Sequence, residues 1–395
     1  MYIEQAFKSH HEWWRYVIGV LAAITGVFIF SVPHLVAIAM KQMDGEVDLS
    51  KLDDINYIMG LFDPNINLIL ILLPFVGGLL FLLLFVKILH QQSIVKLTTS
   101  RERIDWKRFW FAFLFWGILS SVLTIIGYYM SPEDYVVNFN LVPFMVLCVL
   151  AIILVPLQTS FEEYLFRGYL IQGLGVSSFH RNTPIVFVYT ILSALGYIFF
   201  NYLFPFTAFE SLLIIAILSG LLILICNLKI LDGFKSSSGY RVFHSILKRN
   251  WMPLAVTSGI FGLLHISNPE VEKLGYIIMV YYIGTGLFLG ILALMDEGIE
   301  LSLGFHAANN LFTALLVTAD WTAFQTHSIL KDMSNPTEAG FMDVFLPVFV
   351  LFPILLFIFA KKYKWTNWID KLFGRVEDPK VEAEIEEIGV SDGAN

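Results

Sequence analysis

Apolar residues along this chain occur in long, nearly unbroken runs. Several of these runs reach the roughly 20 residues that a helix needs to cross a hydrocarbon core. The runs do not alternate in segments of about ten residues, which excludes a transmembrane barrel. The pattern predicts an all-α, polytopic transmembrane helical bundle of about ten spans, near residues 17–40, 68–86, 109–129, 141 into an acid pair at 162–163, 184–204, 211–228, 253–266, 276–295, 301–317 and 344–360.

Composition supports this class of protein. Of the 395 residues, 57% are hydrophobic and only 15% are charged, and the mean hydropathy is +0.72. A soluble domain of this length does not have such a composition. The chain has no basic stripe, so nucleic acid is not an expected partner, whereas the lipid bilayer is.

Basic residues gather in alternate connections between the expected spans. Because cytoplasmic loops carry an excess of Lys and Arg, this distribution predicts that both termini are cytoplasmic, and that in a bacterial cell the chain lies in the inner membrane. The basic residues are Lys96, Arg101, Arg103, Lys107 and Arg108 after the second span, Lys229, Lys235, Arg241, Lys248 and Arg249 after the sixth, and Lys361, Lys362 and Lys364 after the last. The opposite connections carry Asp44, Glu46, Asp48, Asp53, Asp54, Glu133 and Asp134.

Two acids and an arginine interrupt the fourth apolar run. Glu163 and Arg167 are four residues apart, share a helix face and are expected to form an ion pair. Glu162 lies about 100° around the helix with no expected partner nearby in sequence, which leaves its carboxylate free for chemistry. Charges at membrane depth are costly and indicate function. The alternative is that both acids mark the point where the helix leaves the membrane.

Two further polar motifs lie in apolar spans. Phe261 and His265 are four residues apart, as are His306 and Asn310. A single histidine within a membrane is usually a hydrogen-bonded structural residue. Together with Glu162, however, these groups would cost less if they converged in one polar pocket. Such a pocket has the parts for hydrolysis, with Glu162 as general base, His265 beside the water, and His306 with Asn310 donating to an oxyanion.

The order of these motifs resembles that of a known family. E-E-x-x-x-R at Glu162 to Arg167, F-x-x-x-H at Phe261 to His265 and H-x-x-x-N at His306 to Asn310 are similar to the motifs of the CPBP family. This family comprises CAAX-protease and bacteriocin-processing (Abi) intramembrane endopeptidases, including type II CAAX prenyl endopeptidases. The resemblance covers roughly residues 141–317.

The resemblance implies roles for the residues of these motifs. Glu162 would activate water, His265 would be its partner, and His306 with Asn310 would stabilise the oxyanion. Glu163, Arg167 and Phe261 would have supporting roles. Glu162, His265 and His306 could also hold Zn²⁺, although a glutamate mechanism needs no metal, and the sequence leaves both possibilities open.

The expected organisation follows from the motifs. N-terminal spans occupy residues 1–140, and a catalytic membrane core occupies 141–320, with a two-span insertion at about 175–250 into an eight-helix family core. A loop and last span occupy 321–375, and an acidic disordered tail 376–395. A helix rises by about 1.5 Å per residue. If the span that carries His265 begins at Pro253, His265 would therefore lie further from the cytoplasmic face than Glu162.

Three functions remain open on the sequence. The first is an endopeptidase whose protein or peptide substrate enters from the membrane or the cytoplasm. Buried acids and histidines are also typical of a proton-coupled transporter. The third is a catalytically silent membrane scaffold.

Overall fold

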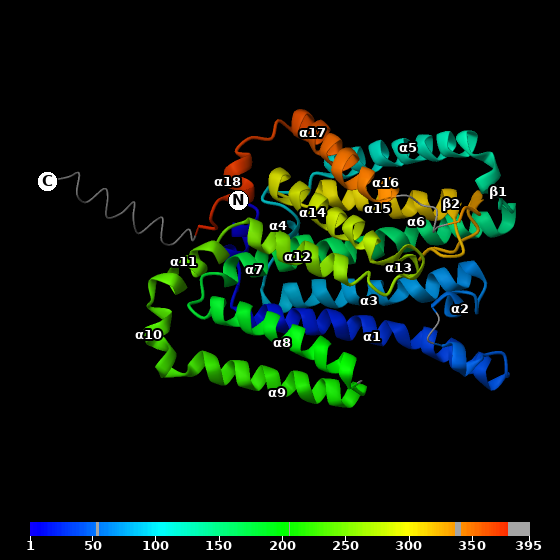
Figure 1. The fold of residues 1–395 in the computed structure, drawn as a ribbon. Coiled ribbons are helices and arrows are strands. Elements are labelled where there is room, and N and C mark those ends of the chain that lie inside the picture. The colour runs from blue at the N-terminus through cyan, green and yellow to red at the C-terminus, as the bar shows by residue number, and fades with distance from the viewer. Residues whose placement is uncertain (53–54, 205, 336–340, 378–395) are drawn as a thin grey trace.

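The computed structural model describes residues 1–52, 55–204, 206–335 and 341–377. The chain forms an elongated bundle whose long helices run side by side along one axis (Figure 1). The all-α class expected from the apolar runs is therefore confirmed. The central helices are α1 (Trp13–Met43), α3 (Pro64–Leu89), α5 (Trp106–Met130), α6 (Leu141–Glu163), α12 (Trp251–Leu263), α14 (Met279–Asp296) and α15 (Glu300–Leu316), flanked by α16 (Phe341–Leu346) and α17 (Phe352–Tyr363).

Fewer helices than expected have the length and composition of a membrane span. Among the described residues seven qualify, or eight if the bent pair Leu213–Asn227 and Lys229–Lys235 is one span. The two other expected spans correspond to α12 and α15. α12 has only 13 residues, which is about 20 Å at 1.5 Å per residue, and α15 has 17 residues and begins at the buried Glu300. These are the helices that carry the two histidine motifs.

Close contacts between small residues set the helix packing. A Cβ atom on Gly26 of α1 would clash with the carbonyl oxygen of Gly77 of α3, so the two backbones are in contact at this point. Small residues allow such approaches between membrane helices. Apolar clusters fill the spaces between α5, α14, α15 and α17 and between α3, α6 and α15.

The two ends of the bundle differ. The inner end, which holds the N-terminus, carries α4 (Ile94–Thr98), α7 (Ile171–Ser177), α10 (Asp232–Lys235), α11 (Ser238–Leu247) and α18 (Trp368–Phe373). The outer end carries α2 (Ile55–Met59), β1 (Tyr135–Val137), β2 (Val317–Thr318) and β3 (Leu330–Asp332). On the orientation predicted from basic residues, the inner end is cytoplasmic.

A small sheet closes part of the outer end. β3 lies between β1, with which it is antiparallel, and β2, with which it is parallel. The sequence does not predict this sheet, because strands of two or three residues are too short to show alternation.

Buried ion pairs close the inner end. Arg101 contacts Asp296 at 3.2 Å and Glu300 at 3.3 Å, and Arg108 also pairs with Asp296. Trp365 Nε1 donates to Asp296 Oδ1 at 2.9 Å. These contacts join the start of α5, the turn between α14 and α15, and the segment after α17.

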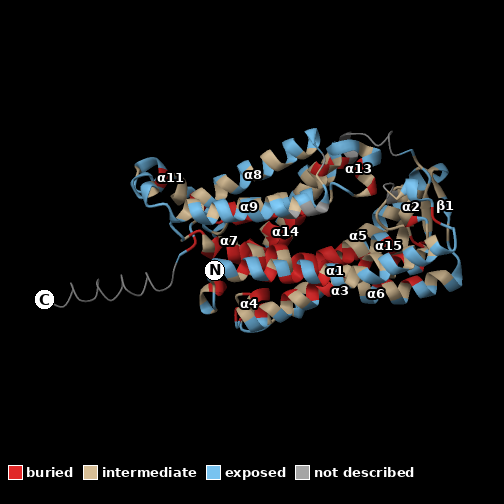
Figure 2. Cartoon of the chain, turned by 90° about the horizontal axis from the view of Figure 1, so that it is seen from below, coloured by how far each residue is buried: buried red, intermediate tan, exposed pale blue. Residues whose placement is uncertain are grey.

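The segment expected as an insertion forms a helical hairpin of α8 (Thr183–Leu203) and α9 (Ala208–Asn227). The Tyr189 hydroxyl donates to the Leu218 carbonyl at 2.8 Å and links the two helices. Figure 2 shows α8 and α9 mostly pale blue and tan, whereas buried residues gather on α14 and its neighbours. In a membrane this exposed apolar surface faces lipid.

The C-terminal tail is described only at its start. Val376 is buried, and its backbone N–H donates to the Lys248 carbonyl at 3.1 Å. The acidic tail predicted to be disordered is residues 376–395, of which residues 378–395 lie outside the described residues.

Candidate active site

Both acids of the central motif lie at the buried end of α6. Glu162 and Glu163 are its last two residues, and a π-helical segment, Tyr164–Leu170, continues the chain into α7. π-Helical turns are rare and occur frequently at functional sites. Glu162 and Glu163 are 8% and 0% exposed, so neither acid marks a surface boundary.

The predicted ion pair between Glu163 and Arg167 is present. Arg167 Nη1 donates to Glu163 Oε1 at 3.0 Å. The guanidinium group also donates to the Gly286 carbonyl at 3.2 Å and lies 4.1 Å from the centre of the Phe261 ring. Phe261 thus supports the arginine through a cation–π contact, which connects the first and second motifs.

His306 lies between the two glutamates. Its Nδ1 is 2.8 Å from Glu163 Oε1, and its Nε2 is 3.5 Å from Glu162 Oε2. The structure therefore brings the first and third motifs into direct contact. Both ring nitrogens face carboxylates, which differs from the oxyanion role that the resemblance implies for His306.

The expectation that Glu162 has no partner nearby in sequence was wrong. Gln158, one helical turn earlier, donates from Nε2 to Glu162 Oε1 at 2.7 Å. Gln158 Oε1 in turn accepts from Asn310 Nδ2 at 3.1 Å. Gln158 therefore holds the candidate base and connects it to Asn310, and its position four residues before Glu162 was a signal that the sequence contained.

His265 lies beyond the end of α12, in the connection to α13 (Pro269–Leu274). Its Nδ1 is 2.7 Å from the Phe261 carbonyl oxygen, and its ring stacks on Tyr282 with centroids 4.5 Å apart. Since a carbonyl oxygen only accepts, Nδ1 carries the proton in this contact, and Nε2 is left for another group. α12 is short, so this connection lies inward of the outer edge (Figure 1).

A cavity of about 560 Å³ joins these groups. Glu162, His265 and Asn310 all line it, together with Gln158. Glu270 of α13 also lines the cavity, where its Oε1 accepts from the Ala323 backbone N–H at 2.8 Å and its buried Oε2 has no hydrogen-bond partner among the described residues. Sequence reasoning missed Glu270, because it lies in a connection that reads as an ordinary polar loop.

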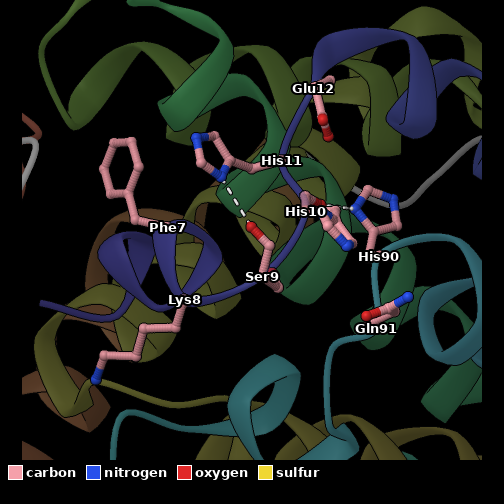
Figure 3. A pocket seen from close by; sticks show the side chains of 8 residues that line it. All are labelled: Phe7, Lys8, Ser9, His10, His11, Glu12, His90 and Gln91. Atoms are coloured by element: carbon pink, nitrogen blue, oxygen red, sulfur yellow. Dashed lines mark hydrogen bonds between the residues drawn. The ribbon is translucent and has the colours of Figure 1, made fainter.

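A second hollow lies at the inner end, between the N-terminal segment and the end of α3 (Figure 3). It contains His10, His11 and His90, but His90 is engaged in structural contacts. Its Nδ1 is 2.6 Å from the His10 carbonyl oxygen and its Nε2 is 2.8 Å from the Tyr169 hydroxyl. Burial lowers the pKa of His90, which favours its neutral form. None of the predicted site residues lines this hollow.

The suggested zinc ligands do not form a metal site in this arrangement. Within the described ranges, no group of three or more His, Cys, Asp or Glu side chains is placed to hold a metal ion. His306 Nδ1 contacts Glu163, and His265 Nδ1 contacts the Phe261 carbonyl oxygen. Zinc dependence stays a prediction from the resemblance, and no step below uses a metal.

The fold and the site together define an integral membrane protein with carboxylate and imidazole groups buried among its helices. Residues 239–312 match the family of type II CAAX prenyl endopeptidase Rce1-like proteins. This match contains the second and third motifs, and it confirms the resemblance. At the level of the family it supports a CAAX-protease-like intramembrane endopeptidase, and therefore a hydrolase.

A curated relative extends the similarity over more of the chain. An uncharacterized protein of Bacillus subtilis (strain 168), YyaK, is 24% identical over 312 residues, which cover 79% of this chain and 80% of that protein. No solved structure matches the chain.

Proposed function

We propose that this protein is an intramembrane endopeptidase in which Glu162 activates a water molecule to hydrolyse a peptide bond of a protein or peptide substrate. The observation that carries the proposal is the placement of Glu162 Oε2. This atom is buried beside the cavity, 3.5 Å from His306 Nε2, with no hydrogen-bond donor on it among the described residues. A carboxylate oxygen in this position can accept a proton from water.

Glu163 fixes the orientation of His306. Because a carboxylate only accepts, the 2.8 Å contact places the imidazole proton on Nδ1. The lone pair of neutral His306 then points from Nε2 towards Glu162. Arg167 provides the positive charge that a buried, ionised Glu163 requires.

The reaction follows from these positions. Glu162 removes a proton from water, and the resulting hydroxide attacks the substrate carbonyl carbon. His306 Nε2 accepts that proton from Glu162 and delivers it to the leaving amine, so that peptide and water become a carboxylic acid and an amine. Asn310 lines the cavity, and the second N–H of its Nδ2 is the donor for the oxyanion. Nε2 of His265, on the same lining, accepts a hydrogen bond from the attacking water.

The test compares wild type with Glu162→Gln in detergent, using a peptide library as substrate. General-base catalysis contributes about 10²- to 10⁴-fold, and we expect a loss of this size. Glu272→Gln is the matched control, since its side chain is 59% exposed and outside the cavity lining, and it should retain full activity. A Glu162→Gln enzyme that cleaves at the wild-type rate contradicts the proposal.

Each assay is repeated with a chelator. Cleavage by wild type that persists with the chelator supports a glutamate mechanism without metal, and its loss points to a bound metal. Proton-driven uptake by vesicles that Glu162→Gln abolishes, without any cleavage, would favour the transporter instead.

A further inference from the structure

The cavity belongs to the outer half of the bundle. Most of the described residues that line it come from an element next to the outer end or from the half of a long helix that faces this end, whereas Gln158 and Glu162 lie at the other end of α6. The lining residues on the outer side include Met59 of α2, Ile71 and Phe75 in the first half of α3, and Trp321 and Phe324 in the segment after β2. The inner-end connections contribute no lining residue among those described.

The candidate base lies near the middle of the bundle along its axis. The ring of Phe161, which precedes Glu162 in the sequence, packs against Gly78, and Gly78 lies close to the midpoint of α3. The outer ends of α3 and α6 are level, since Asn65 Nδ2 donates to the Pro143 carbonyl at 3.0 Å. The cavity therefore runs from about mid-membrane towards the outer end.

Successive layers of buried contacts separate the site from the inner end. Glu163 and Arg167 form the first layer. Beyond them, the Tyr164 hydroxyl is 2.9 Å from Thr98 Oγ1. Two further hydrogen bonds lie in this direction. The Tyr2 hydroxyl donates to the Leu97 carbonyl at 2.5 Å, and Gln172 Nε2 donates to the Lys96 carbonyl at 3.1 Å. A polypeptide that approached from the inner end would have to break these contacts, which involve buried polar groups that are costly to leave unpaired.

The basic residues assign a side of the membrane to each end. The connections at the inner end carry the Lys and Arg clusters typical of cytoplasmic loops. The outer end carries acidic residues such as Asp48, Asp63 and Asp134. The cavity therefore opens on the side away from the cytoplasm.

From this geometry we infer that the substrate reaches the site from the extracytoplasmic face, as an exported peptide or an external segment of a membrane protein. The inference rests on the proposed endopeptidase function and replaces the access from the membrane or cytoplasm expected from the sequence. The lining also indicates the chemistry of the segment that binds. The lining combines apolar side chains such as Ile71, Leu72 and Phe324 with the carboxyl groups of Glu162 and Glu270. Among the described residues, no Lys or Arg lines the cavity. The expected substrate is an apolar segment with a cationic rather than an acidic flank.

Thiol labelling tests the access route independently of catalysis. In a chain with Cys148→Ala and Cys226→Ala, Ser267→Cys places a thiol on an exposed residue of the cavity lining, and Ser236→Cys places one on an exposed residue of the inner end. A membrane-impermeant maleimide should label Ser267→Cys in intact cells, and Ser236→Cys only after permeabilisation. Labelling of Ser267→Cys only after permeabilisation, or in neither state, overturns the inference.

Cleavage in sealed vesicles separates this inference from the proposed function. An impermeant apolar peptide with a basic flank should be cleaved by right-side-out vesicles, and prior maleimide treatment of Ser267→Cys should block this cleavage. Cleavage by inverted vesicles alone overturns the access route and leaves the endopeptidase intact. The expected labelling without cleavage in either orientation overturns the endopeptidase and leaves the opening of the cavity established.

Discussion

The outer and inner ends of this bundle use charge in different ways. At the outer end, ion pairs are exposed, as in the 2.8 Å contact between Lys331 and Asp320, whose side chain is 73% exposed. At the inner end, Asp296 and Glu300 are 1% and 0% exposed and pair with arginines. Exposed pairs stabilise a protein little, whereas removing one partner of a buried pair is strongly destabilising. The inner end is therefore the rigid base of the bundle, and the outer end is free to open a cavity.

The largest effect is expected at the inner end, from Asp296→Ala. This change removes the partner of Arg101, Arg108 and Trp365 at once. We expect a loss of about 3 kcal/mol in stability, measured as a lower midpoint of thermal unfolding in detergent. Asp320→Ala at the outer end is the control and should cost less than about 1 kcal/mol. Equal effects of the two substitutions would contradict the difference between the ends.

The next largest effect is expected from Glu163→Gln, in the buried ion pair of Glu163 and Arg167 between the two ends. The substitution leaves Arg167 without a carboxylate and weakens the orientation of His306. Loss of the partner that orients a metal-bound histidine typically costs about 10- to 100-fold in activity, and we expect kcat to fall by a similar factor here. KM should change little.

A change in the pH–rate profile distinguishes positioning from a general loss of structure. Glu163→Gln should alter the profile, since His306 loses its carboxylate, whereas the exposed control Glu272→Gln should leave both kcat and the profile unchanged. A wild-type profile with a normal kcat would show that Glu163 does not position His306.

The smallest effect is expected where α12 and α14 meet beside the site. A Cβ atom on Gly286 would lie 2.9 Å from the Ser258 carbonyl oxygen, whereas one on Gly259 meets nothing within 4 Å. Gly286→Ala should therefore cost about 1–2 kcal/mol through overpacking, and Gly259→Ala should be neutral or slightly stabilising. Thermal unfolding of the two variants measures the difference, and a stabilising Gly286→Ala would show that the helices can separate freely.

The sequence predicted the features that depend on local spacing. Long apolar runs gave the helical class, and a separation of four residues gave the pair of Glu163 and Arg167. The same separation of four residues lies between Gln158 and Glu162, so the sequence also contained the signal for their hydrogen bond.

Contacts between distant segments could not be predicted in the same way. His306 meets Glu163 because α15 packs against α6, and no spacing within either helix encodes that contact. The position of His265 was uncertain because the length of α12 was not fixed by its apolar pattern. Its helix ends at Leu263, before the histidine, and the connection folds back towards the cavity. Glu270 reaches the cavity for the same reason.

The π-helical segment Tyr164–Leu170 has a consequence for the evolution of related sequences. Deleting one residue within such a segment restores an ordinary α-helix. The deletion would preserve nearly all of the hydropathy and charge of this stretch. Because the wide π turn accommodates one extra residue, the side chains of α7 would keep nearly the same direction relative to α6. Descendants with a deletion between Glu163 and Arg167 would keep the acid motif and the course of the helix, but their glutamate and arginine would be three residues apart instead of four. The number of residues between Glu163 and Arg167 is therefore a better sign that this ion pair is retained than the letters E-E and R alone.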